Sequence, residues 1–357
     1  MKVPAIQILT LTLALQLASS CQEIYEPRIL AEAEVLVVEG TITTDSGPHI
    51  VMLSMASRFD GHRHRRPVYE ARIWIEDCHH QTTPLEHFER GSYLTPPGFK
   101  GEEGRTYTLH IETSDGQRYV SRQQEILPAI DNPDFSGSFG TDYRYEESGV
   151  SGRIIQREYE GGFVFIDAGG GTPETPPFRF TSTLYLQYSE MIGGGSFPGT
   201  FNFCWITRDI THLADRNVSS QTGVSMPSAF VPWENHVLHH YEFPQLVYNS
   251  PRIVIQRVYT LNRDSYAFHA AKNDQLGDEG RIFDPVAAQL PGNIECITDP
   301  GRPVFGHFEA SSLKTFSHRV FINRGERSIE VTPTAANMDT IPPSGCLHEA
   351  YPPFWVF

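Results

Sequence analysis

Residues 106–113, TYTLHIET, decide the fold class, because polar and apolar side chains alternate along them without a break. Residues 71–77, ARIWIED, alternate in the same way. Successive side chains of a β-strand point to opposite faces, so each stretch predicts a strand with one apolar and one polar face. Such strands belong to antiparallel sheets that cover a core with one face and meet water with the other. The predicted inward residues are Ala71, Ile73, Ile75, Tyr107, Leu109 and Ile111.

Further strand and turn patterns surround these two stretches. VLVVEGTITT (35–44) and HIVMLSMA (49–56) read as strands on either side of a turn rich in Asp, Ser, Gly and Pro. SDGQ (114–117) has the composition of a hairpin turn, and RYVSR after it reads as the returning strand. We therefore expect residues 34–126 to form a β-sandwich.

The remaining chain shows a second set of strands. Residues 125–152 are rich in Pro, Gly and acidic side chains and have no period, so we place a domain boundary near Leu127. Strand patterns resume at 153–168, 181–190 and 252–261. We expect 127–357 to be a larger β-rich domain, which makes the fold class mainly β.

One helix stands out in this second part. Residues 262–277, NRDSYAFHAAKNDQLG, contain few strand-forming residues and carry helix signals at both ends. Asn262 or Asp264 can act as the N-cap, and Gly277 suits a left-handed C-terminal position. The second domain is thus expected to hold one or two short helices.

The first 20 residues have the order of a secretory signal: a positive charge at Lys2, a short apolar run, then small residues. Leu17 to Cys21, LASSC, resembles the bacterial lipobox, in which the Cys becomes the lipidated first residue of the mature chain. A plain signal peptide with an incidental Cys is the alternative. We expect 1–20 to be the signal, Cys21 to be lipidated and 21–33 to be a tether. Each buried acyl CH₂ contributes about 0.8 kcal/mol, so several chains give stable anchoring.

Composition bounds the partners. An apolar fraction of 39% with 22 Phe and 15 Tyr is ample for a core. The net charge of −15 argues against nucleic acid, whose phosphates need a basic surface. We therefore expect no nucleic-acid partner, and an acidic surface that keeps an exported protein soluble.

Cysteine usage leaves several pairings open. With Cys21 lipidated, four thiols remain: Cys78, Cys204, Cys296 and Cys346. An even number in an exported chain permits two disulfides in three connectivities, and free buried thiols are the alternative. The bridge we favour is Cys296–Cys346.

Candidate metal and catalytic groups are weak. Asp60, His62 and His64 share a face if extended, but the same stretch carries Arg side chains that repel a cation, so a solvated loop is the preferred interpretation. The His pairs at 79–80 and 239–240 are adjacent, so on strands they would point to opposite faces. Two Gly runs lack the ending of a phosphate-binding loop, and no nucleophile motif is present. We expect no metal, no cofactor and no catalytic residues.

Aromatic side chains gather in the non-periodic segment. Its rings suit docking to a protein or stacking on sugars if they are exposed, and they would pack on the domain seam if they are not. The predicted interaction loop comprises Phe135, Phe139, Tyr143 and Tyr145.

Several stretches together resemble one family. They include PVYEARIWIED (67–77), GSYLTPPGFKGEEGRTYTLHIETSDGQRYVS (91–121), LPAIDNPDF (127–135) and the stretch QRVYTL to HFEAS (256–311). In this order they resemble the domain-of-unknown-function 4249 family of Bacteroidota lipoproteins. The resemblance implies an exported lipoprotein with an immunoglobulin-like or transthyretin-like first domain, and it assigns no catalytic residues.

The resemblance also implies a partner and a location. Members of the family are often encoded beside TonB-dependent transporters, which implies an accessory role at the outer membrane. Glu23 and Glu26 in the tether resemble the surface-export signal of such lipoproteins, and Asp339-Thr340-Ile341 resembles their O-glycosylation acceptor, with Thr340 as its hydroxyl.

We therefore expect a non-enzymatic lipoprotein, anchored by lipid to the outer membrane and facing outward. It would act as the accessory or binding subunit of a TonB-dependent β-barrel transporter. A structural subunit of a larger outer-membrane or export complex is the alternative, and a surface hydrolase is the third interpretation.

Overall fold

The computed structural model describes residues 35–56, 66–147, 153–168, 176–192, 200–210, 218–219, 225–233, 252–277, 290, 292–334, 341–342, 344–348, 350 and 352–353. Strands dominate these residues, so the mainly β fold class is confirmed. The first group of strands comprises β1 (Val35–Thr43), β2 (Ile50–Ala56), β3 (Arg66–Pro67), β4 (Arg72–Asp77), β5 (Thr82–His87), β6 (Ser92–Leu94), β7 (Thr106–Glu112), β8 (Arg118–Ser121) and β9 (Gln124–Glu125).

The second group begins with β10 (Asp134–Glu147), β11 (Ile154–Asp167), β12 (Phe178–Ile192), β13 (Thr200–Asp209), β14 (Val218–Ser219), β15 (Met226–Pro232) and β16 (Arg252–Thr260). It continues with helix α2 (Arg263–Gly277) and with β17 (Ile294–Cys296), β18 (Val304–Asn323), β19 (Ser328–Pro333) and β20 (Ser344–His348).

Two layers of sheet enclose the first core. One layer pairs β1 with β2 and β2 with β3 and β6, and the other pairs β4 with β5 and β7, and β7 with β8 and β9. The alternation in the sequence is confirmed, because Ile73, Ile75, Leu109 and Ile111 are all buried in this core. Apolar side chains removed from water between the layers supply the main stabilising term.

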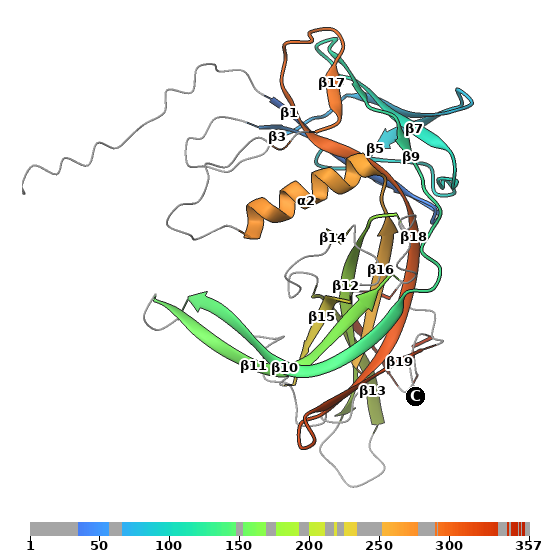
Figure 1. Cartoon of the computed structure of the whole chain (residues 1–357). Coiled ribbons are helices and arrows are strands. Elements are labelled where there is room, and N and C mark those ends of the chain that lie inside the picture. Colours follow the sequence, from blue (N-terminus) through green and yellow to red (C-terminus); the bar gives the residue numbers. More distant parts are fainter. Residues whose placement is uncertain are drawn as a thin grey trace, which may run out of the picture. The chain divides into compact units, whose positions relative to one another are not determined.

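Strand β18 belongs to two sheets (Figure 1). Its first part, from Val304 to Ser311, lies parallel to β1, and its second part, from Ser312 to Val320, is antiparallel to β16. Likewise β17 pairs with β8. Segments near residue 300 therefore complete the core of the first strands, and the domain boundary near Leu127 stays a prediction.

A second core lies between another pair of sheets. The three-stranded sheet β10-β11-β15 packs on the sheet formed by β12, β13, β16, β18 and β19. Strand β12 alternates between two faces: Leu184 and Leu186 face this core, whereas Tyr185 lies in a separate cluster with Trp205 on the other face.

The segment expected to be an interaction loop is strand β10, so the prediction of a loop is wrong. Every second residue from Phe135 faces the same way, and Gly137 belongs to this row. A Cβ on Gly137 would lie 2.8 Å from a methyl group of Val331, so the glycine permits close packing on β19. Gly137, which suggests a turn in the sequence, is instead needed for the close packing of β10 on β19.

Helix α2 begins as predicted. The Asn262 side chain accepts a hydrogen bond from the backbone N–H of Ser265 at 2.9 Å, which makes Asn262 the N-cap. Asp264, the other candidate, instead pairs with Arg122 at 2.9 Å. The cap and this ion pair fix the first turn of α2 to the segment around β9.

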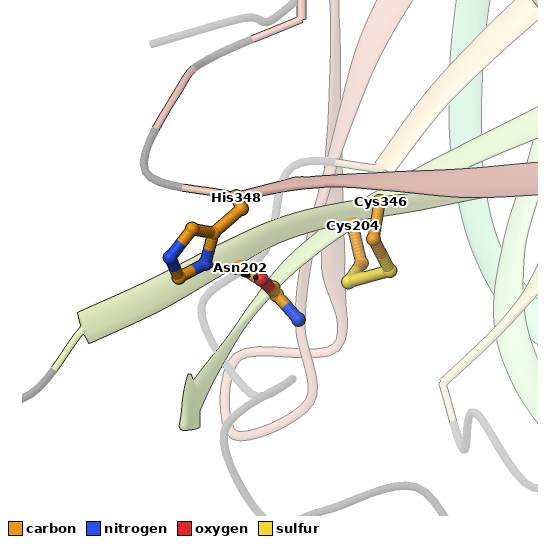
Figure 2. The surroundings of a disulfide bond; sticks show 4 residues. All are labelled: Asn202, Cys204, Cys346 and His348. Atoms are coloured by element: carbon orange, nitrogen blue, oxygen red, sulfur yellow. Dashed lines mark hydrogen bonds between the residues drawn. A yellow bond between two sulfur atoms is a disulfide. The ribbon is translucent and has the colours of Figure 1, made fainter. Parts of the chain in front are cut away.

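The favoured Cys296–Cys346 bridge is wrong, because Cys346 is bonded to Cys204 (Figure 2). The two cysteines lie directly opposite each other in the antiparallel pair of β13 and β20. Two positions along, Asn202 and His348 share a hydrogen bond of 3.2 Å. Cys296 is a free buried thiol and Cys78 a free exposed one. Register between remote strands, which spacing does not reveal, decides the pairing.

Candidate functional site

The candidate site lies where helix α2 covers the outer face of β1 and β18 (Figure 1). In the parallel pairing, Val37, Glu39 and Thr41 of β1 lie opposite Phe305, His307 and Glu309 of β18. These residues share the sheet face that points away from the first core. From α2, side chains spaced three or four residues apart reach this face, because such positions lie on one side of a helix. They are Phe268, His269, Lys272 and Gln275.

The floor of the site needs a glycine. Gly306 has a φ of 100°, in the region that side chains rarely adopt, and a Cβ there would lie 1.8 Å from the carbonyl oxygen of Val38. Only glycine lets β18 approach β1 this closely and still pair with it. The approach sets His307 and Glu309 beside β1 under the helix.

Glu309 is the centre of a buried ionic network. Arg179 on β12 donates two hydrogen bonds to its carboxylate, at 3.0 and 2.8 Å. His269 Nε2 donates at 2.6 Å and Ser311 Oγ at 2.7 Å. Four bonds fill the acceptor positions of a carboxylate. Glu309 is therefore committed to holding α2 and β12 on β18.

The charges in this network support each other. Burial by itself would raise the pKa of Glu309, but the Arg179 guanidinium and the hydrogen bond from His269 hold that pKa well below its ordinary value. Burial disfavours the charge on Arg179, and Glu309 outweighs this and raises its pKa. The guanidinium also lies 3.6 Å from the centroid of the Tyr259 ring. Both groups are thus ionised at neutral pH.

A second network sits beside the first, at the start of α2. Gln124 on β9 accepts hydrogen bonds from the Asn262 amide at 2.9 Å and from the Ser265 hydroxyl at 3.2 Å. The Ser265 oxygen in turn lies 3.0 Å from His307 Nε2. The His307 ring stacks on Phe268 with centroids 4.6 Å apart. These contacts fix the imidazole under the helix.

His307 has one polar atom without a partner. The side chain is 5% exposed, and its Nδ1 has no hydrogen-bond partner among the residues that the structure describes. Burial lowers the pKa of His307 to about 4, so the ring is neutral at pH 7. The same nitrogen is buried from solvent, so its lack of a partner is a cost that the fold bears at this position.

The pocket has a volume of about 500 Å³. It is lined by the polar groups above and by apolar side chains, including Val37, Phe305 and Leu290. Volumes of roughly 300–1,000 Å³ with apolar walls and a few placed polar groups are typical of small-molecule sites. The arrangement is suited to binding a small ligand.

The His pair at 79–80 does not form a metal site. Both side chains are exposed, and His80 bonds to Glu76 at 2.6 Å. Glu76 also pairs with His110 at 3.2 Å, and His110 stacks on Trp74. Among the described residues no group of three or more His, Cys, Asp or Glu side chains is arranged to hold a metal ion.

The four aromatic residues of β10 divide into two pairs. Phe135 packs on Phe316 and His318, and Phe139 lies under the Arg327 guanidinium. Tyr143 and Tyr145 are 54% and 75% exposed. The Phe pair thus packs against the core within the second group of strands, and the Tyr pair is exposed; packing on a domain seam stays a prediction.

Several predicted positions lie outside the described residues. They are the lipidation residue Cys21, the glycosylation residue Thr340, the group Asp60, His62 and His64, and the His pair at 239–240. Their roles stay predictions.

The residues of the pocket were missed by reasoning from sequence, although a signal exists. In FGHFEAS, 305–311, His307, Glu309 and Ser311 alternate with Gly306, Phe308 and Ala310. Two ionisable residues on one face of a strand that is otherwise apolar indicate a buried polar partner. The partners come from β12 and α2, far away in the chain, so only the fold could identify them.

The described strands, helix α2 and the segment that closes the first core lie largely within the region covered by a known family. The family model for a domain of unknown function, DUF4249, matches residues 22–317. The chain belongs to the DUF4249 family.

A search of curated proteins found no match to this DUF4249 member. No helix within the described ranges is long and apolar enough to cross a membrane.

Proposed function

We propose that this DUF4249 protein is a lipid-anchored binding subunit at the outer membrane, where it acts with a TonB-dependent β-barrel transporter and catalyses no reaction itself. The observation that carries the proposal is the start of the family match at residue 22, directly after Cys21 of the lipobox-like stretch. A family region that begins there is expected if Cys21 is the first residue of the mature chain.

The pocket under α2 supports a binding role. Its carboxylate already accepts four hydrogen bonds from the protein, so Glu309 holds the site together and is not poised to take a proton from a substrate. The volume and the apolar walls of the pocket favour recognition of a ligand.

The end of the β10-β11 hairpin supports contact with a partner. Strand β15 pairs with β11 only between Gly161 and Ile166, so the outer part of the hairpin is a two-stranded ribbon among the described strands. Tyr143, Tyr145 and Ile154 lie on the same ribbon face as Phe135 and Phe139, but beyond the core that these two cover. We assign this exposed face, 54–75% exposed, to contact with the rim of the barrel.

Anchoring is tested by growth on labelled palmitate. The wild-type chain is expected to carry label and to sediment with the envelope, and Cys21→Ser is expected to lose both. An unlabelled wild-type chain would overturn the lipid anchor.

Association is tested by purification from membranes in mild detergent with mass spectrometry. A TonB-dependent barrel is expected to co-purify with the wild type and to be lost in Tyr143→Asp/Tyr145→Asp. Tyr69→Asp is the matched control, because Tyr69 is 51% exposed in another part of the chain. Recovery of an export complex without a transporter would favour the structural-subunit alternative, and recovery of no barrel would exclude both.

A further inference from the structure

Three polar groups that line the pocket under α2 are open to a ligand. Lys272 is exposed, Thr41 is half-buried and the His269 side chain is 21% exposed. The Lys272 ammonium, the Thr41 hydroxyl and His269 Nδ1 have no polar partner among the described residues. None of these three atoms is a buried unpaired atom, in contrast to His307 Nδ1. They are therefore the groups of the pocket that a ligand can reach.

Glu309 fixes one side of the His269 ring. The Glu309 carboxylate is ionised and only accepts, so His269 Nε2, which lies 2.6 Å from it, carries a hydrogen. Nδ1 on the other side of the ring accepts a hydrogen bond when the ring is neutral and donates one when the ring is protonated. Arg179 balances the charge of Glu309, and the His307 ring 6.4 Å away is neutral at pH 7.

Lys272 supplies a positive charge that no described carboxylate balances. It lies three residues after His269, and residues at this spacing share one side of a helix. None of the positions three or four residues from Lys272 on α2 is acidic. Two carboxylates line the pocket, but Glu309 is held by its four hydrogen bonds and Glu39 interacts with a group other than Lys272. The reachable part of the pocket thus favours an anion.

The same groups restrict the kind of anion. A carboxylate suits Lys272 and Thr41, but it meets a neutral His269 with lone pairs on both sides. A phosphate monoester has a second pKa of about 6, so part of it carries an O–H near neutral pH. Its phosphate can pair with His269 Nδ1 in either protonation state of the ring. Val37 and Phe305 offer apolar surface to the organic part of the ester.

We propose that the pocket between β1, β18 and α2 binds a small phosphate monoester, with its phosphate on Lys272, Thr41 and His269 Nδ1 and its organic part against the apolar walls. The proposal rests on the proposed binding function and deepens it, but the two fail separately. Co-purification with a barrel needs no ligand, and binding of the ester to the purified chain needs no barrel.

The test uses the full chain in dodecyl maltoside, an uncharged detergent, in a phosphate-free buffer at pH 6.5. Saturation-transfer difference NMR is titrated with phenyl phosphate, phenyl sulfate, benzoate and benzyl alcohol, which share an aromatic ring and differ in the polar group. Phenyl phosphate is expected to bind most tightly. Phenyl sulfate has a similar shape but no O–H, and it is expected to bind about tenfold more weakly. Binding of any of the other three as tightly as phenyl phosphate overturns the proposal, as does no transfer to phenyl phosphate.

Two competitors distinguish the sources of such an ester. Glucose 6-phosphate represents a soluble metabolite, and dihexanoyl phosphatidate represents a lipid headgroup. Displacement of phenyl phosphate by one of them supports the proposal and identifies the source. Displacement by neither overturns it.

Two substitutions assign the signal to the pocket. Lys272→Gln removes the charge but keeps a good helix former, and it is expected to weaken binding of phenyl phosphate about tenfold. Lys100→Gln is the matched control, because it makes the same change at an exposed Lys that does not line this pocket. Equal binding by both variants overturns the proposal.

His269→Gln tests the hydrogen bond to the phosphate. The Gln amide nitrogen can still donate to Glu309, but the Nδ1 position is lost. The preference for phenyl phosphate over phenyl sulfate is expected to shrink, whereas a merely structural role would weaken binding of both alike. An unchanged preference overturns the role of Nδ1.

A folding defect is separated from a binding defect by the same samples. Circular dichroism and the unfolding temperature are measured for each variant. If His269→Gln does not fold, Thr41→Val replaces it, since Val keeps the shape of Thr and removes only the hydroxyl. Binding of phenyl phosphate by Thr41→Val at wild-type affinity would overturn the placing of the phosphate beside Glu309, which Thr41 faces across the β1-β18 pairing.

Discussion

The two faces of β18 between Val304 and Ser311 are equally buried but chemically opposite. Phe308 and Ala310 face the first core and belong to its apolar cluster. His307, Glu309 and Ser311 face α2, and they are 5%, 2% and 0% exposed. The apolar face needs only matching shape, because hydrophobic burial is non-directional. The polar face needs specific partners, and a single missing partner leaves a costly atom behind.

The comparison teaches where function is to be sought. An apolar core tolerates the replacement of one apolar side chain by another of similar volume. A buried ionic network often contributes little net stability compared with apolar residues of similar size. The polar face is therefore better explained by the placing of α2 and of His307 than by stability alone.

The largest effect is expected on the apolar face. Phe308→Ala removes a fully buried ring that covers Gly40, and loss of its contacts should lower the free energy of unfolding by about 3–5 kcal/mol. Urea denaturation followed by circular dichroism measures the change. Phe321→Ala, at an exposed site of the same strand, should change it by less than about 0.5 kcal/mol. Equal losses would show that burial in the first core is not what makes Phe308 stabilising.

A slightly smaller loss is expected on the polar face. Glu309→Gln leaves the Arg179 charge buried without its counter-ion, which should lower the free energy of unfolding by about 3 kcal/mol. In Arg179→Met/Glu309→Leu no charge is stranded, so most of the loss should be regained in the same urea experiment. This account would be contradicted if the double variant lost as much free energy of unfolding as Arg179→Met and Glu309→Leu lose together.

The pH dependence distinguishes the faces without a large perturbation. Burial lowers the pKa of His307 and of His318 to about 4, below the unfolded value of 6.5, so the unfolded chain binds more protons between these values. The stabilisation is complete above pH 6.5 and is lost as the pH falls toward 4. For His307 the loss between pH 7 and pH 4.5 is about 2 kcal/mol.

Urea midpoints across this pH range check the slope. His307→Asn should reduce the slope without abolishing it, because His318 and His49, whose pKa values burial also lowers, still titrate. Phe308→Ala should leave the slope unchanged, since it removes no ionisable group. A wild-type stability that rises toward pH 4.5 would show that the sign is wrong. The lowered pKa of Glu309 acts only below its unfolded value of 4.5, outside this range.

The smallest effect is expected at the start of α2. Asn262→Ala removes the N-cap and the contact with Gln124, and it should lower the free energy of unfolding by about 1 kcal/mol. Asn262→Asp keeps an acceptor for the Ser265 N–H and should recover most of the cap.

Sequence alone determined the elements whose signals are local. The alternation in 71–77 and 106–113 predicted which side chains enter the core, and the burial of Ile73 and Leu109 confirms it. The cap at Asn262 was also predictable, because an N-cap bonds to residues two or three positions away.

Only the tertiary structure decided what depends on remote partners. The residues of β10 read as a loop because of glycines that are there for packing, as Gly137 is for packing on β19. Cys346 pairs with Cys204 because β20 lies beside β13. The pocket joins β1 with β18 and α2 from more than 200 residues further along the chain, so no local pattern could reveal its geometry. Local signals specify which face of a strand is buried, but the partner of a buried His or Glu is fixed by contacts between segments that only folding brings together.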